Sequence, residues 1–241
     1  MLAIAAAIAG YGGASGRAAP MTGCDTRHVA QLPHARTLHG DVDGDGNPDA
    51  AFVVTDFKQA YRCRFWLVVR RRGGIDVGAV RSSGLPGERF MLKMNGLPEL
   101  VALADVAKKP GLELIVRVGQ GASASSAAVF TERDHHLIRM LIKGYPKMVG
   151  STFVYNLGDP LVGGVDCIGG RGSGRVLQVR GGADANGLRW EVEEYVFDVR
   201  GNNFVYLKTV KKHFKGTFQA LIKQIPAARG GAFENCRART P

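Results

Sequence analysis

The segment 41–49 carries oxygen-bearing side chains at alternate positions. These are Asp41, Asp43, Asp45, Asn47 and Asp49. A hard divalent cation takes about six to eight oxygen ligands, and short side chains at alternate positions of a curled loop can converge on one point. Four carboxylates this close together repel one another unless a cation neutralises them. The segment therefore predicts one calcium ion, bound by the four carboxylates and the Asn47 carbonyl, with Gly46 permitting the sharp turn.

The residues that follow this segment separate it from an EF-hand. An EF-hand places a bidentate Glu at the twelfth loop position, where this chain has Phe52 inside the apolar run 50–54. The run is typical of a strand. The segment thus resembles the DxDxDGxxD loop-then-strand motif of FG-GAP/VCBS repeats, which also occurs in integrin-type propeller blades. The resemblance implies calcium binding in a β-propeller-like extracellular protein, and it implies no particular substrate.

The resemblance is specific over residues 40–54 and weak over two later segments, 104–117 and 165–179. The three segments begin with Asp41, Asp105 and Asp166, which stand 64 and 61 residues apart. A period of this size fits a repeated sheet. The second copy has Lys109 where the first has Asp45, and the third keeps only its leading Asp. An ammonium group opposes a cation, so we expect one calcium ion and not three.

Alternating patterns and turn signals predict the remaining elements. Strands are expected at 65–70, 127–131, 137–142, 190–200 and 204–214, and a short amphipathic helix at 218–225. Tyr61 and Cys63 are expected to share one face of the strand at 65–70. The fold prediction is all-β: about three diverged FG-GAP-like repeats in a small or incomplete β-propeller-like architecture, with one short C-terminal helix.

Composition narrows the class of protein. The chain has 241 residues, 45% of them hydrophobic and 22% charged, and a net charge of +11, which fits a folded domain and excludes a disordered chain. Its apolar runs are too short to predict an integral membrane protein. Basic residues cluster at 70–72 and 208–215, either as solvated strand ends or as a surface for polyanions such as acidic polysaccharide. Few aromatic residues accompany them, so nucleic acid is not expected as a partner.

The N-terminal segment indicates export. Residues 1–23 are rich in Ala and Gly and are similar to a secretory signal that lacks its basic start; the alternative is an Ala-rich tail of an intracellular protein. Residues 24–241 are expected to form a single β-repeat domain. The predicted location is secreted or cell-surface, and lipid attachment at Cys24 is possible but not favoured.

Four cysteines fit an oxidising compartment. They are Cys24, Cys63, Cys167 and Cys236. Their spacing matches no metal knuckle, and the sequence does not decide among the three possible pairings. One pairing, Cys24 with Cys236 and Cys63 with Cys167, would tie the ends of the folded region together and close long loops.

These observations favour an exported calcium-binding module for binding or adhesion, with one calcium stabilising the fold. Its partner is unknown; a polysaccharide or a cell-surface protein fits. Two alternatives remain open: a secreted hydrolase that uses the Asp cluster or the region of His135, and a structural scaffold without a ligand. An enzyme is disfavoured because no general base or open metal position adjoins the loop, and 134–136 fits a polar hairpin turn.

Overall fold

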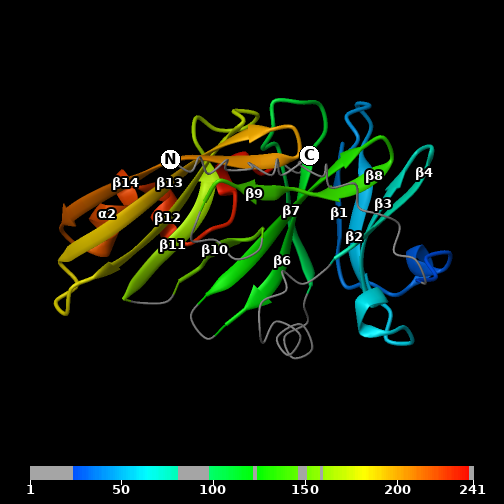
Figure 1. Cartoon of the computed structure of the whole chain (residues 1–241), viewed down its shortest axis with the longest axis horizontal. Coiled ribbons are helices and arrows are strands. Elements are labelled where there is room, and N and C mark those ends of the chain that lie inside the picture. Colours follow the sequence, from blue (N-terminus) through cyan, green and yellow to red (C-terminus); the bar gives the residue numbers. More distant parts are fainter. Residues whose placement is uncertain (1–23, 81–97, 122–123, 146–150, 158–159, 239–241) are drawn as a thin grey trace, which may run out of the picture.

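The computed structural model describes residues 24–80, 98–121, 124–145, 151–157 and 160–238. Their strands form three sheets, which lie side by side in chain order (Figure 1). The first sheet has the order β1-β2-β3-β4, and every neighbouring pair is antiparallel. Its strands are β1 (Thr37–Gly40), β2 (Asp49–Thr55), β3 (Phe65–Arg71) and β4 (Gly74–Ala79). This meander starts with the hairpin that contains the predicted calcium loop.

The second sheet has the order β10-β7-β6-β5, with β8 also pairing with β7. Its strands are β5 (Glu99–Ala104), β6 (Glu113–Gln120), β7 (Ser125–Arg133), β8 (His136–Arg139) and β10 (Phe153–Tyr155). The third sheet has the order β11-β12-β13-β14-β9, and only β9 pairs in parallel. Its strands are β11 (Leu161–Cys167), β12 (Arg175–Ala183), β13 (Arg189–Arg200), β14 (Asn203–Lys215) and β9 (Leu141–Lys143).

The three segments that share a leading Asp occupy the same place in the three sheets. Each forms the turn between the first two strands of its sheet: β1 and β2, β5 and β6, and β11 and β12. The prediction of a mostly β fold with one short helix is therefore confirmed. Among the described strands, pairing stays within each sheet, and the sheets form a row without closing into a propeller.

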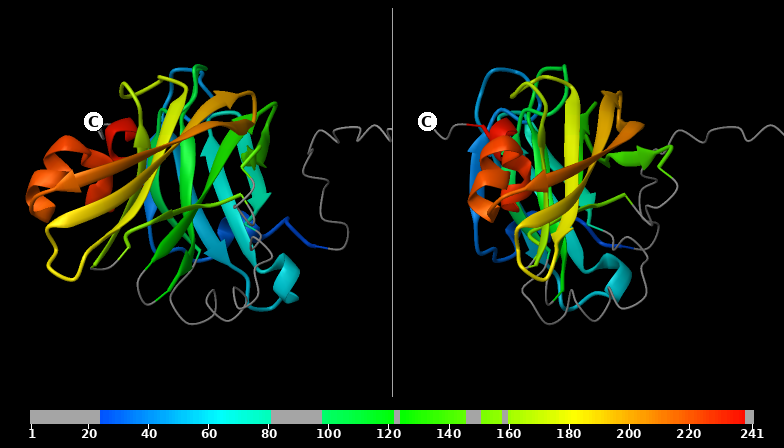
Figure 2. Two further views of the ribbon diagram at one scale, coloured as in Figure 1. Left: turned by 60° about the vertical axis from the view of Figure 1, so that its left-hand side comes forward. Right: turned by 90° about the vertical axis from the view of Figure 1, so that its left-hand side faces the viewer.

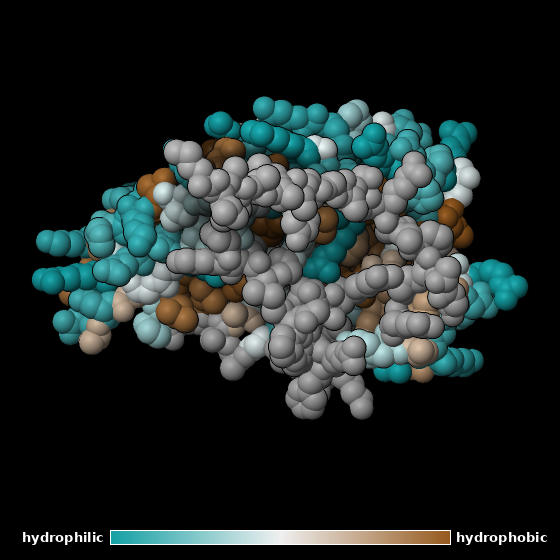
Figure 3. Space-filling model, viewed as in Figure 1, coloured by the Kyte–Doolittle hydropathy of each residue, from teal (hydrophilic) through white to brown (hydrophobic). Residues whose placement is uncertain are grey.

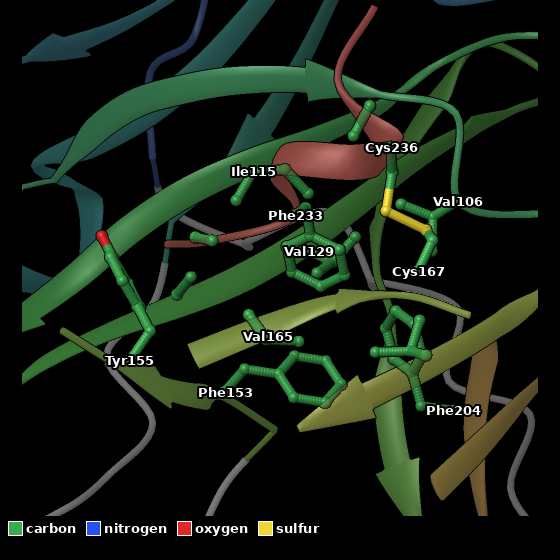
Figure 4. Packing of buried hydrophobic residues seen from close by; sticks show 14 of the residues in the cluster. Val106, Ile115, Val129, Phe153, Tyr155, Val165, Cys167, Phe204, Phe233 and Cys236 are labelled. Carbon is green, nitrogen blue, oxygen red and sulfur yellow. A yellow bond between two sulfur atoms is a disulfide. The ribbon is translucent and has the colours of Figure 1, made fainter. Parts of the chain in front are cut away.

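Apolar side chains fill the two seams between neighbouring sheets. Leu67 and Val69 of the first sheet share a buried cluster with Leu114 and Phe130 of the second. The larger cluster joins the second and third sheets and centres on Phe153, whose ring meets three other Phe rings edge-on at 4.9–5.5 Å (Figure 4). Edge-to-face contacts of this kind add to the free energy of burial. The seams make the three sheets one packed body.

The C-terminal residues 231–238, here called the C-terminal strap, join the second and third sheets through their backbone. Val165 N–H donates to Gly231 O at 3.0 Å, and Asp105 N–H donates to Cys236 O at 2.8 Å. The strap also contains η4 (Glu234–Cys236) and the fully buried Phe233. A disulfide between Cys167 and Cys236 fixes it to the end of β11 (Figure 4).

The disulfide pairing that would tie the ends together is wrong. The bonds are Cys24–Cys63 and Cys167–Cys236, closing loops of 39 and 69 residues. Cys24 packs with the cluster on the outer face of the first sheet, whereas Cys236 lies in the seam between the second and third sheets. Each bond is worth about 4 kcal/mol in the chain-entropy model.

Local elements follow the sequence with two corrections. Tyr61 and Cys63 do not extend the face of β3, because they form the 3-10 helix η2 (Tyr61–Cys63). The single strand predicted at 137–142 is also wrong, because it is divided into β8, which pairs with β7, and β9, which pairs with β14.

The predicted C-terminal helix is confirmed as α2 (Phe218–Gln224), where Thr217 caps the first turn by accepting from Ala220 N–H at 3.4 Å. It leads into η3 (Pro226–Arg229). Both helices cover one face of the third sheet (Figure 2). The remaining short helix, η1 (Val29–Gln31), packs on the first sheet.

Candidate metal centre

Loop 1, residues 41–49, turns back tightly between β1 and β2. Gly44 and Gly46 adopt φ values of 83° and 86°, in the left-handed region that favours glycine. A Cβ on Gly44 would lie 2.6 Å from the Cβ of Pro110 in the second sheet. Glycine at this position therefore serves both the turn and the close contact with the neighbouring loop.

Three carboxylates of loop 1 converge. Oxygen atoms of Asp41, Asp43 and Asp49 all lie within 4.8 Å of one another. Asp49 is almost fully buried at 1% exposure, whereas the other two are half-buried. A cluster of three carboxylate oxygens, open to solvent on one side, suits a hard cation that completes its shell with carbonyl oxygens and water.

Backbone N–H groups hold these carboxylates in place. Asp49 Oδ2 accepts from Val42 N–H at 2.8 Å and from Asp43 N–H at 3.3 Å. Asp41 accepts from Gly44 N–H at 2.7 Å and from Gly46 N–H at 3.1 Å. The acidic side chains are thus positioned by the loop itself, so a cation would meet an arranged set of oxygens.

The electrostatics of loop 1 favour an added positive charge. Burial raises the pKa of Asp49, and the charges of Asp43 and Asp45 act in the same direction, while the N–H donors oppose them. A raised pKa means that the negative form is disfavoured by its surroundings. A bound cation would reverse this imbalance.

Asp45 and Asn47 are placed differently from the other predicted ligands. Asp45 is exposed and is not one of the three convergent carboxylates. Its Oδ1 accepts from Asn47 N–H at 2.7 Å, and this hydrogen bond lowers the pKa of Asp45. The roles of Asp45 and the Asn47 carbonyl as calcium ligands therefore remain predictions.

Loop 2, residues 105–113, repeats the backbone arrangement with a different charge. Glu113 Oε2 accepts from Val106 N–H at 2.9 Å and from Ala107 N–H at 3.1 Å, as Asp49 does from the matching positions of loop 1. Lys109 Nζ lies 3.4 Å from Glu113 Oε1 and donates to Pro110 O at 3.2 Å. The chain's own ammonium therefore neutralises the carboxylate of loop 2.

The three loops lie against one another along the row of sheets. Leu112 N–H of loop 2 donates to Asp41 O of loop 1 at 2.9 Å. Loop 3, residues 166–174, donates to loop 2 through Gly172 N–H and Asp105 O at 2.7 Å. Arg171 of loop 3 also lies 3.8 Å from Asp105 Oδ2. Loop 2 is thus enclosed by its two neighbours.

A second group of potential ligands was missed by the sequence analysis. Asp76 of β4, Glu132 of β7 and His135 of the β7–β8 turn bring ligand atoms within 4.8 Å of one another. No spacing in the sequence signals this group, because the seam between two sheets assembles it. Arg71 Nε lies 2.8 Å from Asp76 Oδ2, so a side-chain cation already neutralises the buried Asp76.

Three histidines make local contacts within the fold. Asp134 and His135 adopt φ values of 51° and 63°, which confirms the polar hairpin turn. His135 N–H donates to Glu132 Oε1 at 2.5 Å. Near the first sheet, His28 bonds Asp56 at 2.8 Å and His34 stacks on Phe52 at 3.9 Å.

No protein-family model, curated protein or solved structure matches this chain. The two disulfides indicate an oxidising, extracellular-type environment. The bond to Cys63 also occupies the Cys24 sulfur that a lipid would need. The predicted export signal, residues 1–23, lies outside the described residues. Within the part of the chain that the structure describes, no helix is long and apolar enough to cross a membrane.

Proposed function

We propose that this protein is an exported binding or adhesion module whose fold is stabilised by one calcium ion in loop 1, and that its three loop-bearing hairpins are diverged FG-GAP/VCBS-like repeats in an open, incomplete propeller-like row of sheets. Asp41, Asp43 and Asp49 are the core ligands, and Asp45 and the Asn47 carbonyl complete the set. The observation that carries the proposal is the convergence of three carboxylates within 4.8 Å in a chain of net charge +11; each accepts from backbone N–H groups, Asp43 from Asp45 N–H at 3.1 Å.

The ion would act as a stabiliser of the first sheet. It binds the arranged loop and not the unfolded chain, so it stabilises the folded state by mass action. With an affinity of about 10⁻⁴ M, typical of extracellular modules, a few millimolar calcium adds about 2 kcal/mol. Because loop 1 contacts loop 2 through Leu112 and Asp41, the gain extends to the seam between the first two sheets.

Thermal unfolding in excess EDTA and in a few millimolar calcium tests this proposal. Calcium is expected to raise the wild-type midpoint by about 4–8 °C. Asp43→Asn, which removes one convergent carboxylate and keeps its shape, should lose most of this shift. Asp134→Asn is the matched control, because Asp134 is exposed in a turn at positive φ that Asn also favours. Equal shifts in both variants, or no shift in the wild type, would reject loop 1 as the calcium site.

A further inference from the structure

The third sheet has one covered and one open face. On the covered face, Trp190 and Val192 of β13 pack against Leu221 and Ile222 of α2. The opposite face is hollowed into a groove of about 660 Å³ across β12, β13 and β14. Figure 2 shows the helices on one side of these strands only, and Figure 3 shows mostly hydrophilic residues at this end of the molecule.

The strand register explains why this face is hollow. One row across the sheet runs Leu161–Gly182–Glu191–His213. Gly182 has no side chain, and a Cβ there would meet only Leu161 Cδ2 at 3.4 Å and Pro160 O at 3.9 Å. The sheet surface is therefore bare at Gly182, and the longer side chains around this position form the walls of the groove. The volume lies in the usual range of ligand sites, about 300–1,000 Å³.

Cations and acceptors alternate along the walls of the groove. The next row across the sheet is Arg180–Glu193–Lys211, and Lys211 Nζ lies 3.4 Å from Glu193 Oε1. Tyr195 O–H also donates to Glu193, which spreads the negative charge of this carboxylate. Arg189 also lines the groove and stands opposite Lys215 in the strand register. Strand β14 itself contains four Lys and no Asp or Glu.

These side chains favour a ligand that has both anionic groups and hydroxyl groups. Arginine and lysine bind carboxylates or sulfates through charge-assisted hydrogen bonds. Glu191 and His213, which are exposed at 86% and 79%, can accept hydrogen bonds from hydroxyl groups. From these features we infer that the groove binds an acidic polysaccharide. This inference deepens the proposed function by giving the module a ligand class and a site.

Two other classes of ligand fit the groove poorly. A protein partner usually anchors in apolar or aromatic pockets, but the two aliphatic lining residues, Val192 and Ala183, pack their side chains into the cluster on the covered face. Single-stranded nucleic acid stacks its bases on exposed aromatic rings, whereas Tyr195 is only 5% exposed and packs edge-on against Tyr145. The groove thus offers charge and hydrogen bonds without a stacking platform.

The test measures binding of a short oligogalacturonate by isothermal titration calorimetry at near-physiological salt. The groove variant combines Arg189→Gln and Lys211→Gln, both exposed positions. The control variant combines Lys208→Gln and Lys223→Gln, which remove the same charge away from the groove face. We expect the groove variant to bind at least about tenfold more weakly than wild type, and the control to change by less than about twofold.

Three results would overturn the inference: no binding by wild type, equal losses in the two variants, or equally tight binding of polyglutamate. The second and third would show that the net charge of the surface, and not the groove, attracts the probe. The experiment is independent of the calcium test, which is read by unfolding without oligosaccharide. Asp43→Asn, studied below its unfolding midpoint, should still bind the oligogalacturonate.

Discussion

Loops 1 and 2 share one backbone arrangement, but the negative charge of their carboxylates is neutralised in different ways. In both, the ninth residue is an acid whose carboxylate accepts from two N–H groups at the start of the loop. In loop 2, Lys109 reaches this acid, Glu113, at 3.4 Å. In loop 1 the residue matching Lys109 is Asp45, so the loop supplies no ammonium of its own, although the charges of Arg71 and Arg72 act on Asp43 and Asp45. A loop can thus keep this turn geometry without a metal ion when one of its own residues supplies the positive charge.

The two loops also differ in how far neighbouring segments enclose them. Loop 2 contacts loop 3 through the ion pair of Arg171 with Asp105. It also contacts the C-terminal strap, because Asp105 N–H donates to Cys236 O. Glu113 is fully buried. Loop 1 accepts a backbone hydrogen bond from loop 2 at Asp41 O, and Asp45 faces solvent. An open loop can exchange an ion, whereas an enclosed one benefits from a permanent charge.

Removing the strap's covalent attachment should have the largest effect on loop 2. Cys167→Ala with Cys236→Ala opens a 69-residue loop and should cost about 4 kcal/mol of unfolding free energy, measured by urea denaturation. Hydrogen exchange should accelerate at residues 105–113. The matched pair Cys24→Ala with Cys63→Ala opens a 39-residue loop at similar cost but should leave exchange in loop 2 slow. Equal exchange in both variants would show that the strap does not support loop 2.

Replacing the ammonium of loop 2 should have the next largest effect. Lys109→Met leaves the buried Glu113 carboxylate without its cation and should cost about 1–3 kcal/mol, less than a fully buried pair because Lys109 is 33% exposed. Urea denaturation measures the change, and calcium should not restore the loss. Lys108→Met is the control, because Lys108 is exposed and adjacent. A loss as large in this control would contradict the role given to Lys109.

Reversing the charge at the same position should make loop 2 depend on calcium. Lys109→Asp places a third acid near Asp105 and Glu113, so the variant should be less stable than Lys109→Met in EDTA. Millimolar calcium should recover about 1–2 kcal/mol of that deficit by mass action. Thermal unfolding of both variants with and without calcium makes the comparison. If calcium helps the two variants equally, the charge at position 109 does not decide metal binding.

The smallest expected effect is a pH dependence from Glu113. Burial raises the pKa of Glu113 above its ordinary 4.5, although the Lys109 charge opposes this. The folded state then binds the proton more tightly, so the contribution of Glu113 to stability is full below pH 4.5 and is lost as pH rises through the raised value. The difference in unfolding free energy between wild type and Glu113→Gln should fall over this range by less than about 1.4 kcal/mol per pH unit. A difference that rises with pH has the wrong sign.

Local signals in the sequence predicted much of the fold. The alternate acids of loop 1, the turn at Gly201 before β14 and the helical spacing after Thr217 all concern residues near one another in the chain. These signals gave the mostly β class, the last hairpin and α2. They also showed that Lys109 would oppose a metal ion in loop 2.

Features assembled by tertiary contacts could not be predicted in this way. The pairing of Cys167 with Cys236 depends on where the strap passes between two sheets. The group of Asp76 and Glu132 forms only when two sheets meet. The contact of Lys109 with Glu113 depends on the curvature of the loop. The sequence therefore predicted that Lys109 opposes calcium binding, but it did not predict that Lys109 neutralises the buried Glu113.

The most direct test of the central claim compares the two ninth-position acids. Calcium titration calorimetry should give one ion per chain for wild type and for Glu113→Gln, and no binding for Asp49→Asn, with circular dichroism confirming that each variant is folded. This result would show that only loop 1 takes its cation from solution. Retained binding in Asp49→Asn, or loss of the ion in Glu113→Gln, would contradict the account.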